Sequence, residues 1–289
     1  MGASGFLGRA LCATLEQSGI TVFRYSRSTR PGFYGWDPSS GEMDTEPLEQ
    51  ADAVVNLAGE DIAGGRWTTA RKQVLRDSRV GSTQLLVSTL VKLKRPPAVL
   101  VNASAVGYYG HRGDEAVFEQ SAPGHGFLSE LCQAWEGAAM PAMQRGIRVV
   151  IPRFGLVLST HGGALARMLP AFKLGVAGRL GSGKQFMTWI ALSDAVSMLR
   201  FLLTSDVFGP INAVAPEAVT NEEFTATLGR IVRRPTMLPV PVFALKAALG
   251  ELSQVLLEGA NVRPRVLDEV GFRFDYPRLE DALEALLNT

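Results

Sequence analysis

Three glycines near the start of the chain constrain its fold more than any other feature. The segment Gly2-Ala3-Ser4-Gly5-Phe6-Leu7-Gly8 is followed at once by an apolar helical pattern over about residues 6–18. In such a motif Gly2 permits a tight turn, Gly5 lets the backbone approach a pyrophosphate, and Gly8 lets the helix pack closely on a sheet. The free N–H groups and the dipole of the helix would then face phosphate. Glycine turns before helices are common, so the motif alone leaves open a plain loop-to-helix connection.

Short apolar runs alternate with helical patterns through the first two-thirds of the chain. Continuous apolar runs of this length are typical of strands buried on both faces of a parallel sheet. The alternation therefore predicts an α/β fold with a doubly wound parallel sheet and right-handed crossovers, which is the Rossmann type. The runs predict strands at residues 20–25, 53–57, 98–102 and 147–151, and the periodicity predicts helices at about 6–18, 70–93 and 127–144.

The glycine motif of such a fold ordinarily follows the first strand of the sheet, whereas here only Met1 precedes it. We therefore expect the first strand to be truncated, or to be supplied in another way. A central strand makes ladder hydrogen bonds on both sides, so its loss should destabilise the whole domain.

The last third of the chain is richer in helical patterns. Thr220 and Glu223 have the spacing of a capping box, which predicts a helix over about 221–232. A proline-rich loop follows, and then helical patterns at about 243–258 and 279–287. We expect a smaller helix-rich C-terminal lobe on the substrate side, made of residues 156–189 and 216–289. The dinucleotide-binding domain would span residues 1–155 with a return segment at about 190–215.

Composition excludes several classes of protein. The chain has 29 Lys and Arg against 28 Asp and Glu, a net charge of +1, which gives no electrostatic footprint for nucleic acid. Its two cysteines and three histidines lack the spacing of a disulfide scaffold or a metal site. No apolar run approaches the roughly 18 residues that span a bilayer. We expect a cytoplasmic protein without a membrane or nucleic-acid partner; organellar import stays open because the N-terminus looks truncated, and the oligomeric state is not predicted.

The end of the second predicted strand indicates which dinucleotide is bound. Folds of this type that bind NAD usually place Asp or Glu here, to bond the ribose 2′-hydroxyl. This chain has Tyr25-Ser26-Arg27 instead. The Ser26 hydroxyl can donate to a 2′-phosphate, and Arg27 can pair with it. The sequence therefore predicts NADP(H), with a solvated basic loop around Arg24, Arg27 and Arg30 as the alternative.

A series of short motifs runs along the whole chain in a fixed order. They are the glycine motif, Tyr25-Ser26-Arg27, Trp36-Asp37-Pro38, Asn56-Leu57-Ala58-Gly59-Glu60, Ser78-Arg79, Ser104-Ala105-Val106-Gly107-Tyr108-Tyr109-Gly110, Trp135-Glu136, Arg153-Phe154-Gly155, Trp189-Ile190, Ala215-Pro216, Thr220-Asn221-Glu222-Glu223-Phe224 and Gly271-Phe272. On these markers the chain resembles the extended short-chain dehydrogenase/reductase superfamily. More closely, it is similar to the nucleoside-diphosphate-sugar epimerase branch of the YfcH/SDR39U type.

The resemblance implies a dinucleotide lying across the carboxyl ends of the parallel strands. It assigns the 2′-phosphate to Ser26 and Arg27, and it makes Arg79 a further cofactor contact, for which a surface helix arginine is the alternative. The pyrophosphate would be held by Gly2, Gly5, Phe6, Leu7 and Gly8, and the ribose and adenine side by Leu57, Ala58 and Gly59.

The resemblance also implies where the chemistry would occur. The superfamily uses Ser or Thr after the fifth strand and a Tyr-x-x-x-Lys pair on the next helix, in which Tyr is the acid/base and Lys lowers its pKa. Ser104 fits the first position, but Leu128 and Cys132 fall where Tyr and Lys would be. Tyr108, Tyr109 and Glu130 are candidate substitutes. For the tyrosines the alternative is a place in the core or at its rim, and for Glu130 it is a solvent-exposed charge on the helix.

Cationic and polar residues of the second lobe suggest a substrate side. Arg153 and Lys184 would suit a phosphorylated or nucleotide-linked substrate, and Gln185 and Trp189 border the same region in the resembled family. The alternative is a solvated turn with Trp189 in the core. Similar proteins often have Trp-Ile-His, whereas this chain has Ala191 after Trp189-Ile190, which removes one titrating group.

Two functions remain open on this basis. The first is an NADP(H)-dependent oxidoreductase or epimerase acting on a small polar molecule of the nucleotide-sugar kind, without the usual Tyr-x-x-x-Lys pair. The second is a non-catalytic NADP(H)-binding or sensing protein that regulates a partner. Cofactor binding and catalysis use different residues, so an intact set of cofactor-binding residues is compatible with both functions.

Overall fold

A computed structural model describes residues 1–28 and 30–287; Thr29 and the last two residues of the predicted C-terminal lobe, 288–289, lie outside the described residues. Its central sheet has five strands, all paired in parallel. The order is β12-β8-β5-β4, and the short β6 pairs with the far end of β8. This confirms the predicted parallel sheet. The strands are β4 (Ala53–Asn56), β5 (Val99–Asn102), β6 (Ser104–Ala105), β8 (Arg148–Phe154) and β12 (Gly209–Ala213).

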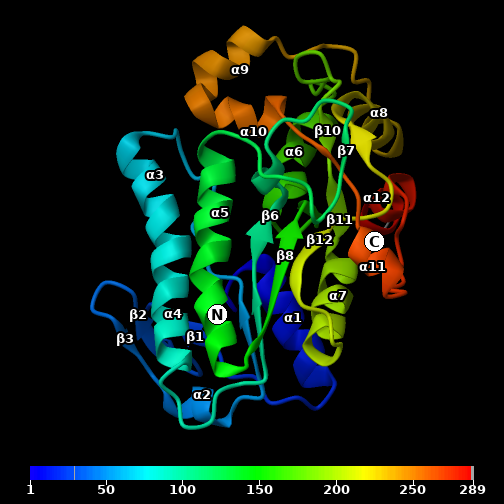
Figure 1. Cartoon of the computed structure of the whole chain (residues 1–289). Coiled ribbons are helices and arrows are strands. Elements are labelled where there is room, and N and C mark those ends of the chain that lie inside the picture. The colour runs from blue at the N-terminus through cyan, green and yellow to red at the C-terminus, as the bar shows by residue number, and fades with distance from the viewer. Residues whose placement is uncertain (29, 288–289) are drawn as a thin grey trace.

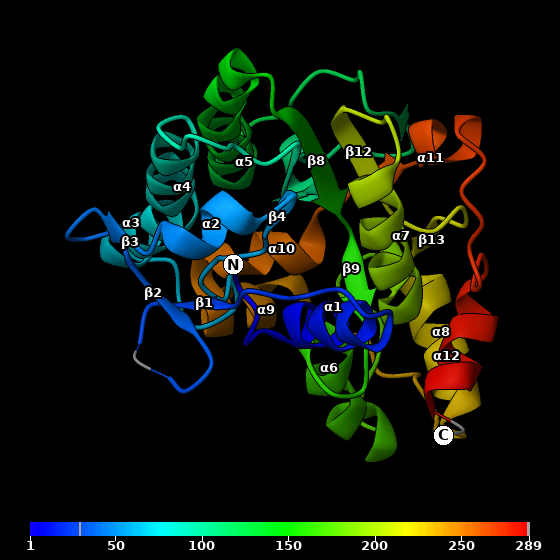
Figure 2. The same ribbon diagram turned by 90° about the horizontal axis from the view of Figure 1, so that it is seen from below.

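Helices cover both faces of this sheet (Figures 1 and 2). On one face α1 (Phe6–Gln17) packs beside α7 (Leu192–Thr204). On the other face lies a long helical stretch beside α5 (Phe127–Ala139), and that stretch consists of α3 (Thr69–Arg76), the π-helical turn η1 (Asp77–Gly81) and α4 (Ser82–Leu90). The doubly wound arrangement is therefore confirmed.

Strand side chains alternate between two apolar cores, as a period of two requires. Leu100 and Ile151 belong to the core under α4, together with Leu86. Val101 and Val150 belong to the core under α1 and α7. Because both faces are buried, β5 and β8 show the continuous apolar runs from which they were predicted.

The C-terminal third is helical, as predicted. Its α8 (Asn221–Ile231) begins with the predicted capping box: Glu223 N–H donates to Thr220 Oγ1 at 3.2 Å, and Thr220 N–H donates to Glu223 Oε2 at 2.7 Å. Among the described residues, no helix is both long and apolar enough to cross a membrane. The domain boundaries stay a prediction. The other α-helices in the second half of the chain are α6 (Gly163–Lys173), α9 (Val242–Leu249), α10 (Gln254–Leu257), α11 (Arg265–Glu269) and α12 (Leu279–Leu287).

Short two-stranded sheets join the helical region to the central sheet. They pair segments that are far apart in the sequence, so local patterns do not predict them. The pairs are β9 (Leu156–Leu158) with β11 (Trp189–Ala191), β10 (Phe186–Met187) with β13 (Val219–Thr220), and β7 (Ala116–Val117) with β14 (Asn261–Val262).

The predicted strand at residues 20–25 is largely wrong. Only β1 (Tyr25–Ser26) is a strand, and it belongs to a separate small sheet with β2 (Tyr34–Asp37) and β3 (Glu42–Met43). Among the described residues, no strand lies between residues 21–23 and β4, and residues 21–23 make no backbone hydrogen bond. A strand requires a paired neighbour, which apolar propensity alone does not provide.

Candidate active site

The glycine-rich turn packs against the loop that follows β4. Gly2 has a φ of 74°, and a Cβ there would lie 2.6 Å from the carbonyl carbon of Leu57. A Cβ on Gly8 would lie 2.2 Å from the Gly2 carbonyl oxygen. Gly5 is exposed at the N-cap of α1, and its N–H donates to the Gly2 carbonyl at 3.0 Å. Packing thus requires Gly2 and Gly8, whereas Gly5 leaves backbone open to a ligand.

The side chains of Phe6 and Leu7 pack the glycine turn onto the protein. Both are half-buried and contact an apolar cluster that includes Ile190. A Cβ on Gly162, at the start of α6, would lie 2.9 Å from the Cβ of Phe6. The side chains of the first turn of α1 therefore face the protein. Its first backbone N–H groups have no partner within the helix and are available to an anion.

Among the described residues, Arg27 makes one long ion pair. Its side chain is 61% exposed, and its Nη2 lies 3.9 Å from Glu60 Oε2 in the loop after β4. Ser26 ends β1, with its Oγ 3.2 Å from Ser28 Oγ. The structure therefore brings the predicted 2′-phosphate residues towards the loop that carries Gly59.

The neighbouring arginines are bound more firmly. A cavity of about 290 Å³ beside the glycine turn is lined by Ser4, Arg9, Arg24 and Arg30, among others. Arg24 donates to Glu16 at 2.6 Å, and Arg9 donates to the Ser4 carbonyl at 2.6 Å. Arg9 and Arg24 are therefore held more firmly than Arg27.

A buried amide network fixes the loop after β4. Asn56 Oδ1 accepts from the Ala58 N–H at 3.2 Å. Asn56 Nδ2 donates to Asn102 Oδ1 at 2.7 Å and to Thr83 Oγ1 at 3.0 Å. Trp135 Nε1 donates to the same Thr83 oxygen at 3.1 Å. Satisfied buried networks of this kind hold backbone rigidly, so Leu57, Ala58 and Gly59 have a fixed position.

Arg79 contacts the same loop through its guanidinium. Its Nη2 donates to the Glu60 carbonyl at 2.9 Å, and its Cζ lies 5.3 Å from the Trp135 ring centroid. A Cβ on Gly59 would lie 3.3 Å from the guanidinium. Burial lowers the pKa of Arg79. This geometry favours a role in positioning the loop over a direct cofactor contact.

Ser104 lies in a buried charged cluster. Its Oγ donates to Glu136 Oε1 at 2.6 Å, and Glu136 lies on α5. Arg153 donates to both oxygens of the same carboxylate, from Nε to Oε1 and from Nη2 to Oε2, at 2.8 Å each. Arg153 is only 3% exposed. The residue predicted on the substrate side is thus paired inside the protein, and the Ser104 hydroxyl hydrogen is already committed.

The two tyrosines beside Ser104 have different surroundings. Tyr109 is fully buried, accepts from Arg153 Nη1 at 2.9 Å and donates to Asn212 Oδ1 at 2.6 Å. Burial raises the pKa of Tyr109 to about 12. Tyr108 is half-buried, and its ring centroid lies 3.5 Å from the Arg153 Cζ. Within the described residues its hydroxyl has no hydrogen-bond partner, so Tyr108 is the phenol free to contact a substrate.

The positions that carry Tyr and Lys in the resembled superfamily face the same loop. A Cβ on Gly107 would lie 3.3 Å from the Leu128 Cβ and 3.9 Å from the Cys132 Sγ. Burial raises the pKa of the Cys132 thiol to about 11, so neither residue exchanges protons near neutral pH. Glu130, the other candidate on α5, is exposed, which fits the solvated helix charge left open above.

The predicted substrate-side residues are not gathered in one place. Gln185 is buried and donates to the carbonyls of Leu180 and Leu256, at 3.1 and 2.8 Å. Trp189 is fully buried in the core of the C-terminal region, which agrees with the alternative interpretation that placed Trp189 in the core. Lys184 is exposed and remains available to a ligand.

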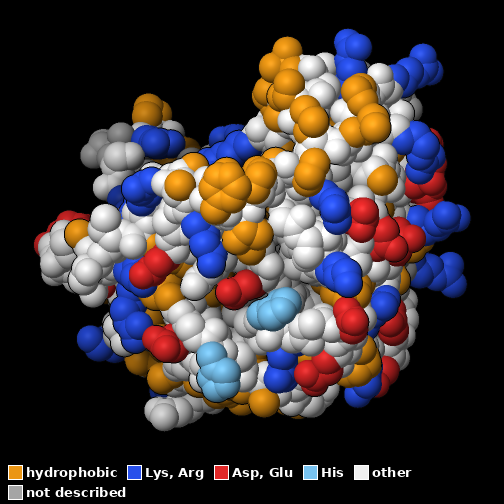
Figure 3. Space-filling model, turned by 90° about the horizontal axis from the view of Figure 1, so that it is seen from above, with side chains coloured by type: hydrophobic (Ala, Val, Ile, Leu, Met, Phe, Trp, Pro, Cys, Tyr) orange, Lys and Arg blue, Asp and Glu red, His pale blue; other side chains and the backbone are white. Residues whose placement is uncertain are grey.

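The segment after Gly59 holds the C-terminal helices above the site. Arg66 donates to the carbonyls of Ala247 and Ala248 near the end of α9. The Trp67 ring packs edge-on against Phe127, 5.1 Å between centroids, beside Leu252. Figure 3 looks onto this end of the molecule, where hydrophobic side chains are interspersed with Lys and Arg. Sequence patterns gave no signal for these contacts.

Comparison with known proteins adds a family context to this geometry. A model described as the NAD dependent epimerase/dehydratase family matches residues 1–214, and one described as a domain of unknown function (DUF1731) matches residues 240–286. An epimerase family protein of Mycobacterium bovis is 46% identical over 286 residues, which cover 98% of this chain and 94% of that protein.

Solved structures agree with these matches. The human epimerase family protein SDR39U1 (isoform 2), crystallised with NADPH, has a TM-score of 0.91 and 35% identity, covering 100% of this chain and 98% of that one. A nucleoside-diphosphate sugar epimerase from Corynebacterium glutamicum has a TM-score of 0.81 and 32% identity, covering 99% of this chain and 57% of that one. The resemblance inferred from the motifs is confirmed. The chain belongs to the NAD dependent epimerase/dehydratase family.

Proposed function

We propose that this chain binds NADP(H) and acts as an oxidoreductase or epimerase on a small polar substrate, with nucleotide-linked sugars as the first class to test. The observation that carries the proposal is the glycine turn. Side chains at Gly2 and Gly8 would collide with backbone, and the turn presents the start of α1 beside the loop after β4. The human relative crystallised with NADPH supports the choice of cofactor.

The residues present fit such a cofactor. The first turn of α1 offers the backbone N–H groups of Phe6 and Leu7 to a pyrophosphate, and the exposed Gly5 leaves room for its approach. Ser26 and the loosely held Arg27 offer a hydroxyl and a guanidinium to a 2′-phosphate, with no competing acid at the end of β1. The nicotinamide would supply hydride transfer, and the protein supplies binding and orientation.

The residues that would take part in the chemistry lie in β6 and in the turn that follows it. Glu136 and Arg153 fix the Ser104 hydroxyl, which can accept a hydrogen bond from a substrate hydroxyl because its own hydrogen points to Glu136. Within the described part of the chain the Tyr108 hydroxyl has no hydrogen-bond partner, and Arg153 lies over the Tyr108 ring. We assign proton exchange with substrate to Tyr108 and orientation of substrate to Ser104.

The first test is calorimetric titration of the protein with NADPH and NADH in parallel. We expect clear preference for NADPH. Binding of neither nucleotide would overturn the proposal, and the function would then have to be sought in the C-terminal helices or in partners.

A second function is favoured by one specific observation. Leu128 and Cys132 occupy the positions of the usual acid/base pair, which suits a protein that binds NADP(H) and regulates a partner without catalysis. Exchange of the hydride at the 4-position of NADPH, measured with a panel of nucleotide sugars, separates the two. Exchange supports the enzyme, and its absence across the panel supports the sensor.

A further inference from the structure

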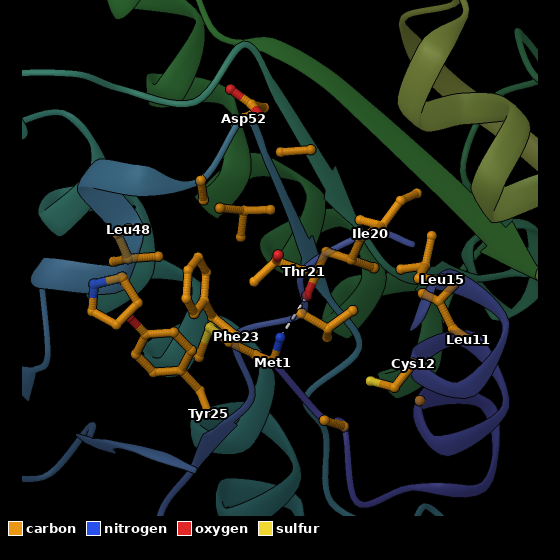
Figure 4. Close-up of a pocket in the computed structure, with 18 of the residues that line it drawn as sticks. Met1, Leu11, Cys12, Leu15, Ile20, Thr21, Phe23, Tyr25, Leu48 and Asp52 are labelled. Carbon is orange, nitrogen blue, oxygen red and sulfur yellow. Dashed lines mark hydrogen bonds between the residues drawn. The ribbon is translucent and has the colours of Figure 1, made fainter. Parts of the chain in front are cut away.

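Two features of the molecule lie outside the site described above. One is a cavity of about 580 Å³ inside the fold, between α1 and β4, where Leu11, Leu15 and Phe23 are among the lining residues (Figure 4). The other is an exposed apolar surface, formed by the end of α6 with the turn after it and by the segment that leads into α9. This surface is called the α6–α9 patch, and its residues are Leu174, Val176, Met237, Leu238, Val242 and Phe243.

Backbone contacts between two distant segments build the α6–α9 patch. The Val240 N–H donates to the Arg179 carbonyl at 2.8 Å, and the Gly181 N–H donates to the Val240 carbonyl at 2.9 Å. A Cβ on Gly178 would lie 1.7 Å from the Leu238 carbonyl oxygen, so the two segments approach each other closely only because this residue is glycine. The backbone under the patch is therefore held in place before any partner binds.

The apolar side chains of the patch project into solvent. Met237 is 87% exposed, Leu174 is 76% exposed and Phe243 is 75% exposed. Single exposed apolar residues are ordinary on protein surfaces, whereas a contiguous group of them marks an interaction site. Side chains this exposed touch little of the protein around them. A partner would therefore have to surround them, since it could not simply fit between them.

Only positive charges accompany these apolar residues. Residues 170–181 and 231–250 contain five Lys and Arg and no Asp or Glu. All five are exposed, and within the described part of the chain none of them makes an ion pair. They are Lys173, Arg179, Arg233, Arg234 and Lys246. Figure 3 shows Lys and Arg side chains beside hydrophobic ones over this end of the molecule. The patch therefore fits a partner that is both apolar and anionic.

Three kinds of partner can be compared on this basis. A second copy of the chain would bring five more cations against the first five, and like charges at a contact oppose association. An acidic protein segment would match the charge, but it would need a groove to hold it, and the side chains of the patch project instead. A bilayer surface with anionic lipid has the opposite charge, and its headgroup region accepts projecting apolar side chains without a matching pocket.

We propose that the α6–α9 patch docks on a bilayer surface that contains anionic lipid. Met237, Leu238 and Phe243 would enter the headgroup region, while Arg233 and Lys246 would face lipid phosphates. The expectation of no membrane partner rested on spanning segments, and docking of this kind needs none. The proposal does not depend on the cofactor or on catalysis, because no residue of the patch takes part in the site described above.

The first test is sedimentation of the protein with vesicles, made of phosphatidylcholine alone or of phosphatidylcholine and phosphatidylglycerol in equal amounts. We expect binding to the anionic vesicles only, and weaker binding as salt screens the charges. Each Lys or Arg near such a surface strengthens binding by about fivefold, so Arg233→Asn with Lys246→Gln should weaken it by about 25-fold. Asn suits position 233 because Arg233 has a φ of 55°.

A second variant separates apolar insertion from charge. Met237→Ser with Phe243→Ser should weaken binding to the anionic vesicles by about tenfold or more, because burial of one such side chain is worth at least that factor. Phe208→Ser is the matched control, since Phe208 is also exposed but lies just before the start of β12, outside the patch. This control should bind as the parent chain does. Equal thermal midpoints show that the variants are folded.

Two results would overturn the proposal. One is absence of binding to the anionic vesicles at low salt. The other is equal binding by the parent chain and by the variant with Met237→Ser and Phe243→Ser. A synthetic peptide of alternating Glu and Leu is the second probe. If that peptide bound the patch while the vesicles did not, the patch would belong to an acidic protein partner and the membrane assignment would be wrong.

Discussion

Arg27 offers the sharpest test of the cofactor assignment. Replacing it with alanine removes a guanidinium that is 61% exposed and whose ion pair with Glu60 spans 3.9 Å. Exposed pairs of this kind contribute about 0–1 kcal/mol, so Arg27→Ala should leave the free energy of unfolding nearly unchanged. Hydrogen bonds to charged groups contribute about 1.5–3 kcal/mol, so the NADPH dissociation constant should rise by about 10- to 150-fold.

The assay is calorimetric titration of both nucleotides at low and at moderate salt. NADH lacks the 2′-phosphate, so its affinity should not change, and the preference for NADPH should weaken as salt screens the exposed charge. Arg95→Ala is the matched control, because the Arg95 side chain is also 61% exposed and pairs with Asp52 away from the glycine turn. An equal loss for both nucleotides, or the same loss in Arg95→Ala, would refute the assignment.

Two further predictions concern stability and are checked by urea unfolding. Gly8→Ala forces a Cβ to 2.2 Å from a carbonyl oxygen and should destabilise strongly, whereas Gly137→Ala on α5 meets nothing and should stabilise by about 0.5–1 kcal/mol. Glu136→Ala leaves Arg153 as an unpaired buried charge and should cost about 3–5 kcal/mol.

Local patterns predicted the parts of the fold that local physics decides. The apolar runs Val99–Val101 of β5 and Val149–Ile151 of β8 are buried on both faces, and α8 begins at a capping box whose two bonds lie within four residues. The segment at residues 20–25 has the same apolar character but forms almost no strand. Its pairing partner is not set by its own sequence, and propensity cannot reveal that.

The candidate site was predicted less completely than the fold. The glycine turn, Arg27 and Ser104 follow from short motifs, but the network that holds Ser104 depends on contacts between distant segments. Glu136 was visible only as part of the Trp135-Glu136 marker, with no role attached to it. Arg66 reaches the Ala248 carbonyl across 182 positions, a contact that no spacing in the sequence indicates.

Whether the chain is an enzyme depends most directly on Tyr108. Its ring lies against Arg153 and its hydroxyl is unpaired within the described residues, so Tyr108→Phe removes one oxygen and keeps the stacking. General acid–base catalysis typically contributes about 10²- to 10⁴-fold, and we expect a loss of that size in hydride exchange with an unchanged NADPH dissociation constant.

Tyr109→Phe is the contrasting variant for that measurement. It breaks bonds to Arg153 and Asn212, so it should lower the free energy of unfolding by about 1–3 kcal/mol, the usual cost of leaving buried partners unsatisfied. Because Tyr109 is fully buried and already paired, its hydroxyl has no path to a substrate. If Tyr108→Phe exchanged hydride as fast as the parent chain, proton exchange would have to come from another group. Since Leu128 and Cys132 supply none near neutral pH, that result would leave an ordered water or the substrate itself as the proton carrier.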